Sequence, residues 1–330
     1  MKKYNVAIVG ATGLVGTTFV RVLEEYRFPV AELRLLASCR SAGKKMVFNG
    51  KEYVVEELKE SSFDGIDLAL FSAGSAVSKQ FAPIAVQKGC LVIDNSSCWR
   101  EDPSVPLIVP EVNLNDYPIN RLIANPNCST IQAMLPLKAL DEAFHLKRVV
   151  FSTYQAVSGS GQKGKEDLLR TRDGFPPQFY PYDISKTCIP EIDVFLENGY
   201  TKEEMKMVHE TRKILHHPDL PVSATCIRVP VLNSHGVVVC CEAEKKMSKA
   251  SVSEVLSRFE NIVLLDDGKK HLYPTSLVAN GTDQVYVGRI REDLSVDNGI
   301  VFYCTADNIR KGAAANAVQI ALKLAELDKI

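Results

Sequence analysis

Three glycines near the N-terminus constrain the fold more than any other feature of the chain. Gly10, Gly13 and Gly16 directly follow an apolar run, 5–9, and open an amphipathic helical pattern, 14–26. Glycines at such a junction allow a tight turn and a close backbone approach to phosphate, and the helix N-terminus attracts negative charge. The GxxGxxG spacing is a variant of the usual fingerprint, so a plain strand–helix turn is the alternative. The pattern favours a dinucleotide-binding domain.

The first 125 residues alternate short apolar runs with helix-like stretches. Further strand candidates are 33–37, 67–71, 91–94, 107–109 and 122–124. This alternation is typical of βαβ units and predicts an α/β fold with a Rossmann-type parallel sheet.

The pattern changes after Cys128. A helical stretch, 129–144, precedes longer strand-like runs at 148–157, 223–230, 236–243, 284–290 and 299–305. Several of these alternate as half-buried antiparallel strands do, which predicts an α+β domain with a mostly antiparallel or mixed sheet. A capping box at Thr201 and Glu204 opens another helix, to about residue 215. The segment 174–190 is expected to be an ordered loop.

The last helix is expected at 308–328, with an Ala-rich face that returns to the first domain. We therefore predict a nucleotide domain of residues 1–127 plus 308–330 and a second domain of residues 128–307. A length of 330 residues supports two domains.

Charge and cysteine usage exclude several classes of protein. The 39 basic and 40 acidic side chains give a net charge of −1, which argues against a nucleic-acid partner. No apolar run approaches membrane-spanning length, so we expect no membrane segment. The nine cysteines are scattered without a CxxC pair, which favours a reducing, cytoplasmic setting and argues against zinc or any other metal.

The end of the second predicted strand bears on the nucleotide. NAD sites usually carry an acidic residue there, but this chain has Ser38, Arg40 and Ser41. A cation and two hydroxyls suit the 2′-phosphate of NADP, and a solvated loop arginine is the alternative.

Cys128 is the candidate nucleophile. It follows Asn125, Pro126 and Asn127 and heads the predicted helix, where the helix dipole lowers a thiol pKa and favours the attacking thiolate. A buried structural cysteine is the alternative, and it is the better interpretation of the other eight.

The best candidate base among six histidines is His235. It lies in a predicted turn between two strands, where catalytic side chains are often presented, although a turn histidine can also be merely solvated. Glu210 and Lys213 share a helix face, and they could form part of a substrate site or a surface ion pair. Arg228, inside an apolar strand, needs an anionic partner. Arg100 follows a strand of the nucleotide domain, at the ligand crevice of such sheets.

Together these motifs resemble the aspartate-semialdehyde dehydrogenase family, nearly from end to end. The segments that carry the resemblance are 10–16, 92–97 with Arg100, 109–113, 125–130, 154–159, 222–230, 287–291 and 306–312. Their order and spacing are together highly specific. The resemblance departs at Ser234 and Gly236, because the family often has glycine before the histidine and serine after it.

The resemblance implies roles for these residues. Cys128 would be the nucleophile, His235 the acid/base, and Gln155 would orient the substrate. The α-carboxylate would meet Arg228, the α-ammonium Glu210, and phosphate would meet Arg100, Asn127 and Lys213. The implied NADP contacts are Gly10, Thr12, Gly13, Leu14, Val15, Gly16, Ser38, Arg40, Ser41, Ser158, Gly159 and Asn308.

The implied reaction is NADPH-dependent, reversible reduction of L-aspartyl 4-phosphate through a thioacyl enzyme, in lysine, threonine and methionine biosynthesis. The resemblance also implies a homodimer, formed by the second domain. An N-acetyl-glutamyl-phosphate reductase is an alternative, but Glu210 and Asn127 argue against it. A non-catalytic nucleotide-binding sensor is another alternative, and it would not need to keep all these side chains together.

Overall fold

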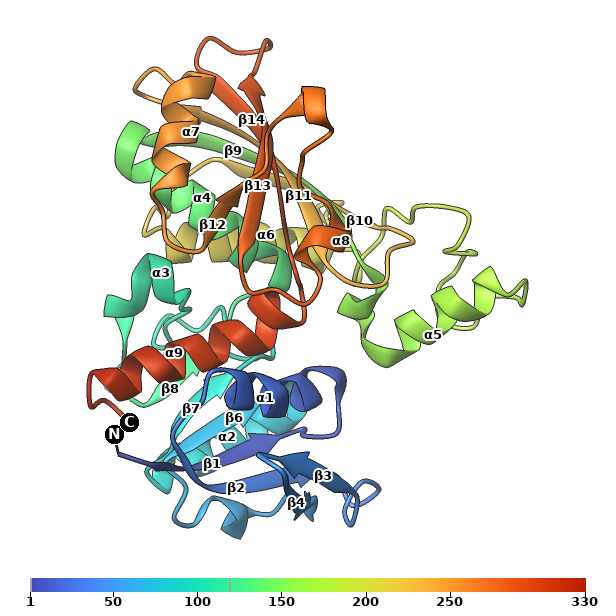
Figure 1. Ribbon diagram of the computed structural model, residues 1–330, viewed down its shortest axis with the longest axis vertical. Helices are drawn as coiled ribbons and strands as arrows, with labels where there is room; N and C mark the ends of the chain where they lie inside the picture. Colours follow the sequence, from blue (N-terminus) through green and yellow to red (C-terminus); the bar gives the residue numbers. More distant parts are fainter. Residues whose placement is uncertain (1, 119) are drawn as a thin grey trace. The chain divides into compact units, whose positions relative to one another are not determined.

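The computed structural model describes residues 2–118 and 120–330 and divides into two compact units. Unit 1 comprises Met1–Pro126 and Ala313–Ile330, and unit 2 comprises Asn127–Gly312 (Figure 1). Among the described residues, no helix is both long and apolar enough to cross a membrane.

Unit 1 is built on a six-stranded sheet with strand order β5-β2-β1-β6-β7-β8, in which all neighbours are parallel. Its strands are β1 (Tyr4–Val9), β2 (Val30–Ala37), β5 (Glu56–Glu57), β6 (Leu68–Phe71), β7 (Leu91–Asp94) and β8 (Leu122–Ala124), with a separate hairpin of β3 (Lys45–Phe48) and β4 (Lys51–Val54). Its helices are α1 (Leu14–Glu25), α2 (Ser75–Gln87), α3 (Pro110–Asn113) and α9 (Ala315–Glu326).

The chain returns to unit 1 through α9, as its Ala-rich face predicts. Val318 and Leu324 of α9 are buried in one core with Phe19 of α1 and with Val6 and Ile8 of β1. Because side chains alternate along a strand, Ala7 and Val9 project to the other face of the sheet. The last helix is shorter than predicted, because a π-helical turn, Arg310–Ala314, precedes α9.

The predicted strand at 107–109 is wrong. Leu107 forms only an isolated bridge with Ala124. Pro106 and Pro110 flank this segment and have no N–H to donate, so the pairing cannot extend, and Pro110 begins α3 instead.

Unit 2 contains a mixed six-stranded sheet of order β10-β9-β11-β14-β13-β12. Its strands are β9 (Leu146–Gln155), β10 (Val222–Arg228), β11 (His235–Ala243), β12 (Ile262–Leu264), β13 (Val285–Glu292) and β14 (Gly299–Ala306), and its helices are α4 (Cys128–Phe144), α5 (Gly161–Arg172), α6 (Lys202–Ile214), α7 (Lys249–Ser257) and α8 (Ser276–Ala279). The pairs β9–β10 and β12–β13 are parallel, and the other three are antiparallel. The predicted fold class, a Rossmann-type domain with a second α+β domain, is confirmed.

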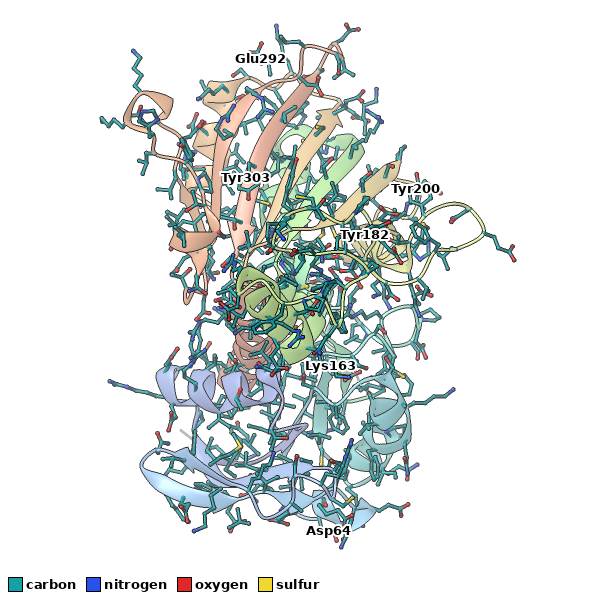
Figure 2. The ribbon with its side chains drawn as sticks, turned by 90° about the vertical axis from the view of Figure 1, so that its right-hand side faces the viewer. Asp64, Lys163, Tyr182, Tyr200, Glu292 and Tyr303 are labelled. Atoms are coloured by element: carbon teal, nitrogen blue, oxygen red, sulfur yellow. The ribbon has the colours of Figure 1, made fainter. Side chains whose placement is uncertain are left out.

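Unit 2 also contains the predicted capping box and the predicted loop. The capping box at Thr201 and Glu204 starts α6 as predicted. Tyr200, labelled in Figure 2, precedes it, and its hydroxyl lies 3.1 Å from Ser223 Oγ of β10. The segment 174–190 contains neither helix nor strand, and its Tyr182 is exposed (Figure 2).

Candidate active site

The glycine loop of unit 1 has the geometry of a phosphate cradle. A Cβ on Gly10, whose φ is +88°, would lie 2.4 Å from Ser72 O, and one on Gly16 would lie 2.1 Å from Gly10 O. Both positions therefore require glycine. Gly13 caps α1 without a side-chain hydrogen bond, so no side chain occupies the cap at this helix N-terminus, where Leu14 and Val15 follow.

The loop after β2 lies beside this cradle. The Thr12 hydroxyl donates a hydrogen bond to Ser41 Oγ over 3.3 Å, which joins the two loops. Ser38 and Arg40 are exposed, and Ser41 is half-buried. The predicted nucleotide residues of unit 1 thus lie around one turn, with a cation and hydroxyls at its rim.

Arg100 is fixed at the carboxyl ends of two strands of unit 1. Its Nε donates to Asn125 O after β8, and its Nη2 donates to Asn95 O after β7, each over 2.9 Å. The guanidinium is buried. Backbone carbonyls at the ends of the two strands accept both of these hydrogen bonds.

Cys128 is the first residue of α4, so it lies at a helix N-terminus as predicted. Asn127 is the N-cap, and its Oδ1 accepts from Ser129 N–H over 2.9 Å. Cys128 is half-buried, and a Cβ on Gly312 would lie 3.0 Å from Cys128 Cβ. The helix dipole favours the thiolate at this position.

Two buried carboxylates of α6 hold Asn127. Its backbone N–H donates to Glu210 Oε2 over 2.6 Å, and its Nδ2 donates to Glu203 Oε1 over 2.9 Å. Lys213 lies one turn after Glu210 on the same helix and is half-buried. Asn127, which precedes Cys128, is therefore anchored through its backbone and its side chain.

His235 differs from its prediction as a turn residue. It begins β11 and is fully buried, because strand pairing with Ala306 of β14 already starts at this position. Its Nδ1 accepts from Ala156 N–H over 2.9 Å, so Nε2 carries the proton of the neutral ring. Among residues 2–118 and 120–330, Nε2 has no hydrogen-bond partner. Burial, with a contribution from the Arg228 charge, lowers the pKa of His235 to about 3, so the imidazole is neutral at pH 7.

Gln155 and Arg228 are paired at the ends of two parallel strands, β9 and β10. Arg228 is 4% exposed, and its Nη1 donates to Ala156 O over 2.7 Å. A Cβ on Gly159 would lie 2.9 Å from Arg228 Nη1 and 3.1 Å from His235 Nε2. Glycine at position 159 therefore allows the backbone to lie against both groups.

Asn308 supports the turn before His235. Its Oδ1 accepts from Ser234 N–H over 2.8 Å and from the Ser158 hydroxyl over 3.1 Å. Ser234 has a φ of 73°, the left-handed region in which the family often has glycine. A Cβ on Gly236 would lie 1.8 Å from the hydroxyl of Tyr303, which is labelled in Figure 2. The exchange of serine and glycine around His235 thus fits the large side chain on β14.

Comparisons with known proteins identify the family of the chain. The NAD binding domain model of semialdehyde dehydrogenases matches residues 5–118, and their dimerisation domain model matches residues 137–311. An aspartate-semialdehyde dehydrogenase of Aquifex aeolicus is 52% identical, over 96% of this chain and 97% of its own length. Another, of Campylobacter jejuni, is 48% identical over 99% of this chain and 98% of its own. The chain belongs to the aspartate-semialdehyde dehydrogenase family.

Solved structures of this family have the same fold. Aspartate semialdehyde dehydrogenase II of Vibrio cholerae, complexed with ASA, matches with a TM-score of 0.95 and 44% identity over 99% of each chain. The family resemblance is thereby confirmed, and unit 1 contains a nucleotide-binding domain.

Two residues near Cys128 are not indicated by the sequence analysis above. Glu203 lies between the capping-box residues Thr201 and Glu204, seven residues before Glu210 and so on the same face of α6. That spacing could have indicated it. Gly312 ends the segment 306–312 that carries the family resemblance, and nothing local predicts that it packs on Cys128.

Proposed function

We propose that this aspartate-semialdehyde dehydrogenase homologue catalyses the NADPH-dependent, reversible reduction of L-aspartyl 4-phosphate to L-aspartate 4-semialdehyde and phosphate. The observation that carries the proposal is the state of Arg228. Among the described residues, its buried side chain hydrogen-bonds only the carbonyl of Ala156 and pairs with no carboxylate. A buried cation is costly without an anion, and the α-carboxylate of the substrate would supply one in a bidentate contact.

Cys128 would form the covalent intermediate. Its thiolate would attack the acyl-phosphate carbon and displace phosphate, leaving a thioacyl enzyme. Arg100, Asn127 and Lys213 are the proposed phosphate ligands, and the buried carboxylate of Glu210 is the proposed partner of the α-ammonium.

His235 would act on the acyl oxygen. Its neutral ring carries the proton on Nε2, so this nitrogen can donate a hydrogen bond as negative charge develops on that oxygen. The acid/base role remains part of the proposal. Gln155 would orient the acyl group near the thiol, and Gly159 leaves room beside the imidazole.

We propose NADP as the nucleotide that unit 1 binds. Gly10, Thr12, Gly13, Leu14, Val15 and Gly16 would hold the pyrophosphate at the start of α1, and Ser38, Arg40 and Ser41 the 2′-phosphate. The support is that Gly10 and Gly16 tolerate no side chain and that residues 37–41 include no acid. Bound in its reduced form, the nicotinamide would supply the hydride for the reduction. Ser158, Gly159 and Asn308 are the contacts proposed from unit 2.

We further propose that the two units have different functions. Unit 1 would bind the nucleotide, and unit 2 would carry the chemistry and form a homodimer. The match of residues 137–311 to a dimerisation domain supports the second assignment.

Intact-mass spectrometry tests the proposed intermediate. Incubation with L-aspartate 4-semialdehyde and NADP, without phosphate, should add one aspartyl group to the wild-type protein and none to Cys128→Ala. Phosphate should then remove the adduct. N-acetyl-glutamate 5-semialdehyde serves as the control substrate and should give no adduct. A protein that binds NADP but forms no aspartyl adduct would overturn the proposal.

A further inference from the structure

Glu203 is a buried carboxylate to which the proposed reaction assigns no role. It lies in the first turn of α6 and is 5% exposed. Oε1 accepts from Asn127 Nδ2 over 2.9 Å and from Gln155 Nε2 over 3.1 Å. One oxygen therefore contacts the residue before the nucleophile and the residue proposed to orient the substrate.

The other oxygen belongs to an ionic cluster. Lys206 Nζ lies 3.0 Å from Glu203 Oε2 and 2.8 Å from Asp193 Oδ2. Burial raises the pKa of Glu203, but Lys206 and the hydrogen bonds from Asn127 and Gln155 outweigh it and lower the pKa to about 2. At neutral pH the side chain is thus a carboxylate, which can accept hydrogen bonds but cannot donate them.

An acceptor-only group determines which way an amide points. Asn127 and Gln155 must each present their NH2 group to Glu203, so their oxygens point elsewhere. Asn127 Oδ1 accordingly caps α4 through Ser129 N–H, over 2.9 Å. Gln155 Oε1 accepts from the Thr153 hydroxyl over 3.0 Å. Both amides are therefore fixed at each end, and each NH2 group keeps a second N–H that can face a substrate.

We propose that Glu203 is a positioning residue, whose carboxylate fixes the amide of Gln155 and the helix cap at Asn127 so that the acyl group meets Cys128 in a reactive geometry. This inference rests on the proposed function. Lys206 and Asp193 hold the carboxylate in turn.

Glu203→Gln tests the proposal with nearly unchanged side-chain volume. A glutamine has one acceptor oxygen, so in either orientation its NH2 group faces a donor, Lys206 Nζ on one side or the two amides on the other. We expect kcat to fall roughly 10–100-fold, because misplacing a reacting group by about 1 Å has effects of this size. KM for L-aspartate 4-semialdehyde should change little, because Arg228 is untouched.

The neighbouring Glu204 provides a matched control. It is 8% exposed, and it accepts from Thr201 N–H over 2.7 Å and from Cys226 N–H over 3.0 Å. Glu204→Gln therefore loses comparable buried contacts without touching the two amides. It should lower Tm and leave kcat within about twofold of wild type. Equal kcat in Glu203→Gln and Glu204→Gln, in a wild type that turns over the substrate, would overturn the inference. A wild type without turnover would instead overturn the proposed function.

Lys206→Met gives a second test of the proposal, which remains available if the Glu203→Gln variant does not fold. Among the described residues, the charged groups that interact with Glu203 are Lys206 and, beyond it, Asp193. The His235 ring is neutral, and burial raises the pKa of the Cys226 thiol, so that group is neutral as well. Without the ammonium, burial should raise the Glu203 pKa, and protonation would turn the acceptor into a donor. The acidic limb of the kcat profile should therefore move to higher pH. An unchanged profile would contradict the assigned role.

Discussion

Substituting Arg228 by lysine changes one buried group and preserves its charge. The guanidinium now reaches Ala156 O over 2.7 Å, and it has further N–H groups for a carboxylate. A lysine ammonium is a point charge that cannot make two parallel hydrogen bonds to one carboxylate. Arg228→Lys should therefore weaken substrate binding through loss of one charged hydrogen bond.

The size of this loss follows from the number of contacts. A hydrogen bond to a charged group contributes about 1.5–3 kcal/mol. Loss of one such bond should raise KM for L-aspartate 4-semialdehyde about 10- to 150-fold. Ala156 N–H also holds His235 Nδ1, so a disturbed Ala156 would appear as a fall in kcat.

The assay compares two aldehydes that differ only in the α-carboxylate. Reduced-nicotinamide absorbance gives KM and kcat for L-aspartate 4-semialdehyde and for 3-aminopropanal, with NADP and phosphate. Wild type should strongly prefer the carboxylated substrate, and Arg228→Lys should lose most of that preference. The control is Arg172→Lys, because the exposed guanidinium of Arg172 also donates to a carbonyl, Pro230 O, over 2.9 Å. It should behave as wild type.

Two results would refute this reasoning about Arg228. The first is an unchanged KM for L-aspartate 4-semialdehyde in a folded variant. The second is an equal loss for both aldehydes, which would mean that Arg228 supports the structure rather than the α-carboxylate.

Three further predictions follow from the same contacts. Arg40→Ala should raise KM for NADP about tenfold and leave KM for NAD unchanged, and equal KM changes would contradict a 2′-phosphate contact. Gly312→Ala should lower kcat and reduce the free energy of unfolding by about 1–3 kcal/mol, because the added Cβ would clash with Cys128. The control is Gly268→Ala, whose Cβ would have no neighbour within 4 Å. Equal effects of the two substitutions would refute the packing argument. His235 has a pKa of about 3 when folded and about 6.5 when unfolded, so between these values the unfolded state binds more protons and stability falls as pH falls. Urea unfolding between pH 6.5 and 4 should show this loss of stability, roughly 1.4 kcal/mol per pH unit, in wild type and not in His235→Asn. Equal slopes of the free energy of unfolding against pH in the two proteins would contradict the prediction.

Local patterns were sufficient for much of the fold. The apolar run before Gly10 and the amphipathic pattern after Gly16 specify β1 and α1, because burial and the glycine turn act on neighbouring residues. The strand predicted at 91–94 matches β7, whose four residues are all buried. The capping box at Thr201 likewise starts α6 through contacts three residues apart.

Long-range contacts account for what the sequence could not predict. His235 resembles a turn residue, yet pairing with Ala306 places it in a buried strand. Glu203 acquires its two amide partners from Asn127, the N-cap of α4, and from Gln155 of β9, which are 76 and 48 residues away and which no local pattern predicts. The exposure of a side chain and its partners depend on such pairings, so the sequence located candidate groups without their hydrogen bonds.

Turnover at the reduced-nicotinamide band tests the central claim most directly. Purified protein is mixed with L-aspartate 4-semialdehyde and NADP, with and without phosphate, as wild type and as Cys128→Ala. Sustained turnover that requires both phosphate and Cys128 is the predicted result, because phosphate must release the thioacyl group. Turnover that persists in Cys128→Ala, or its absence in a wild type that binds NADP, would contradict the account.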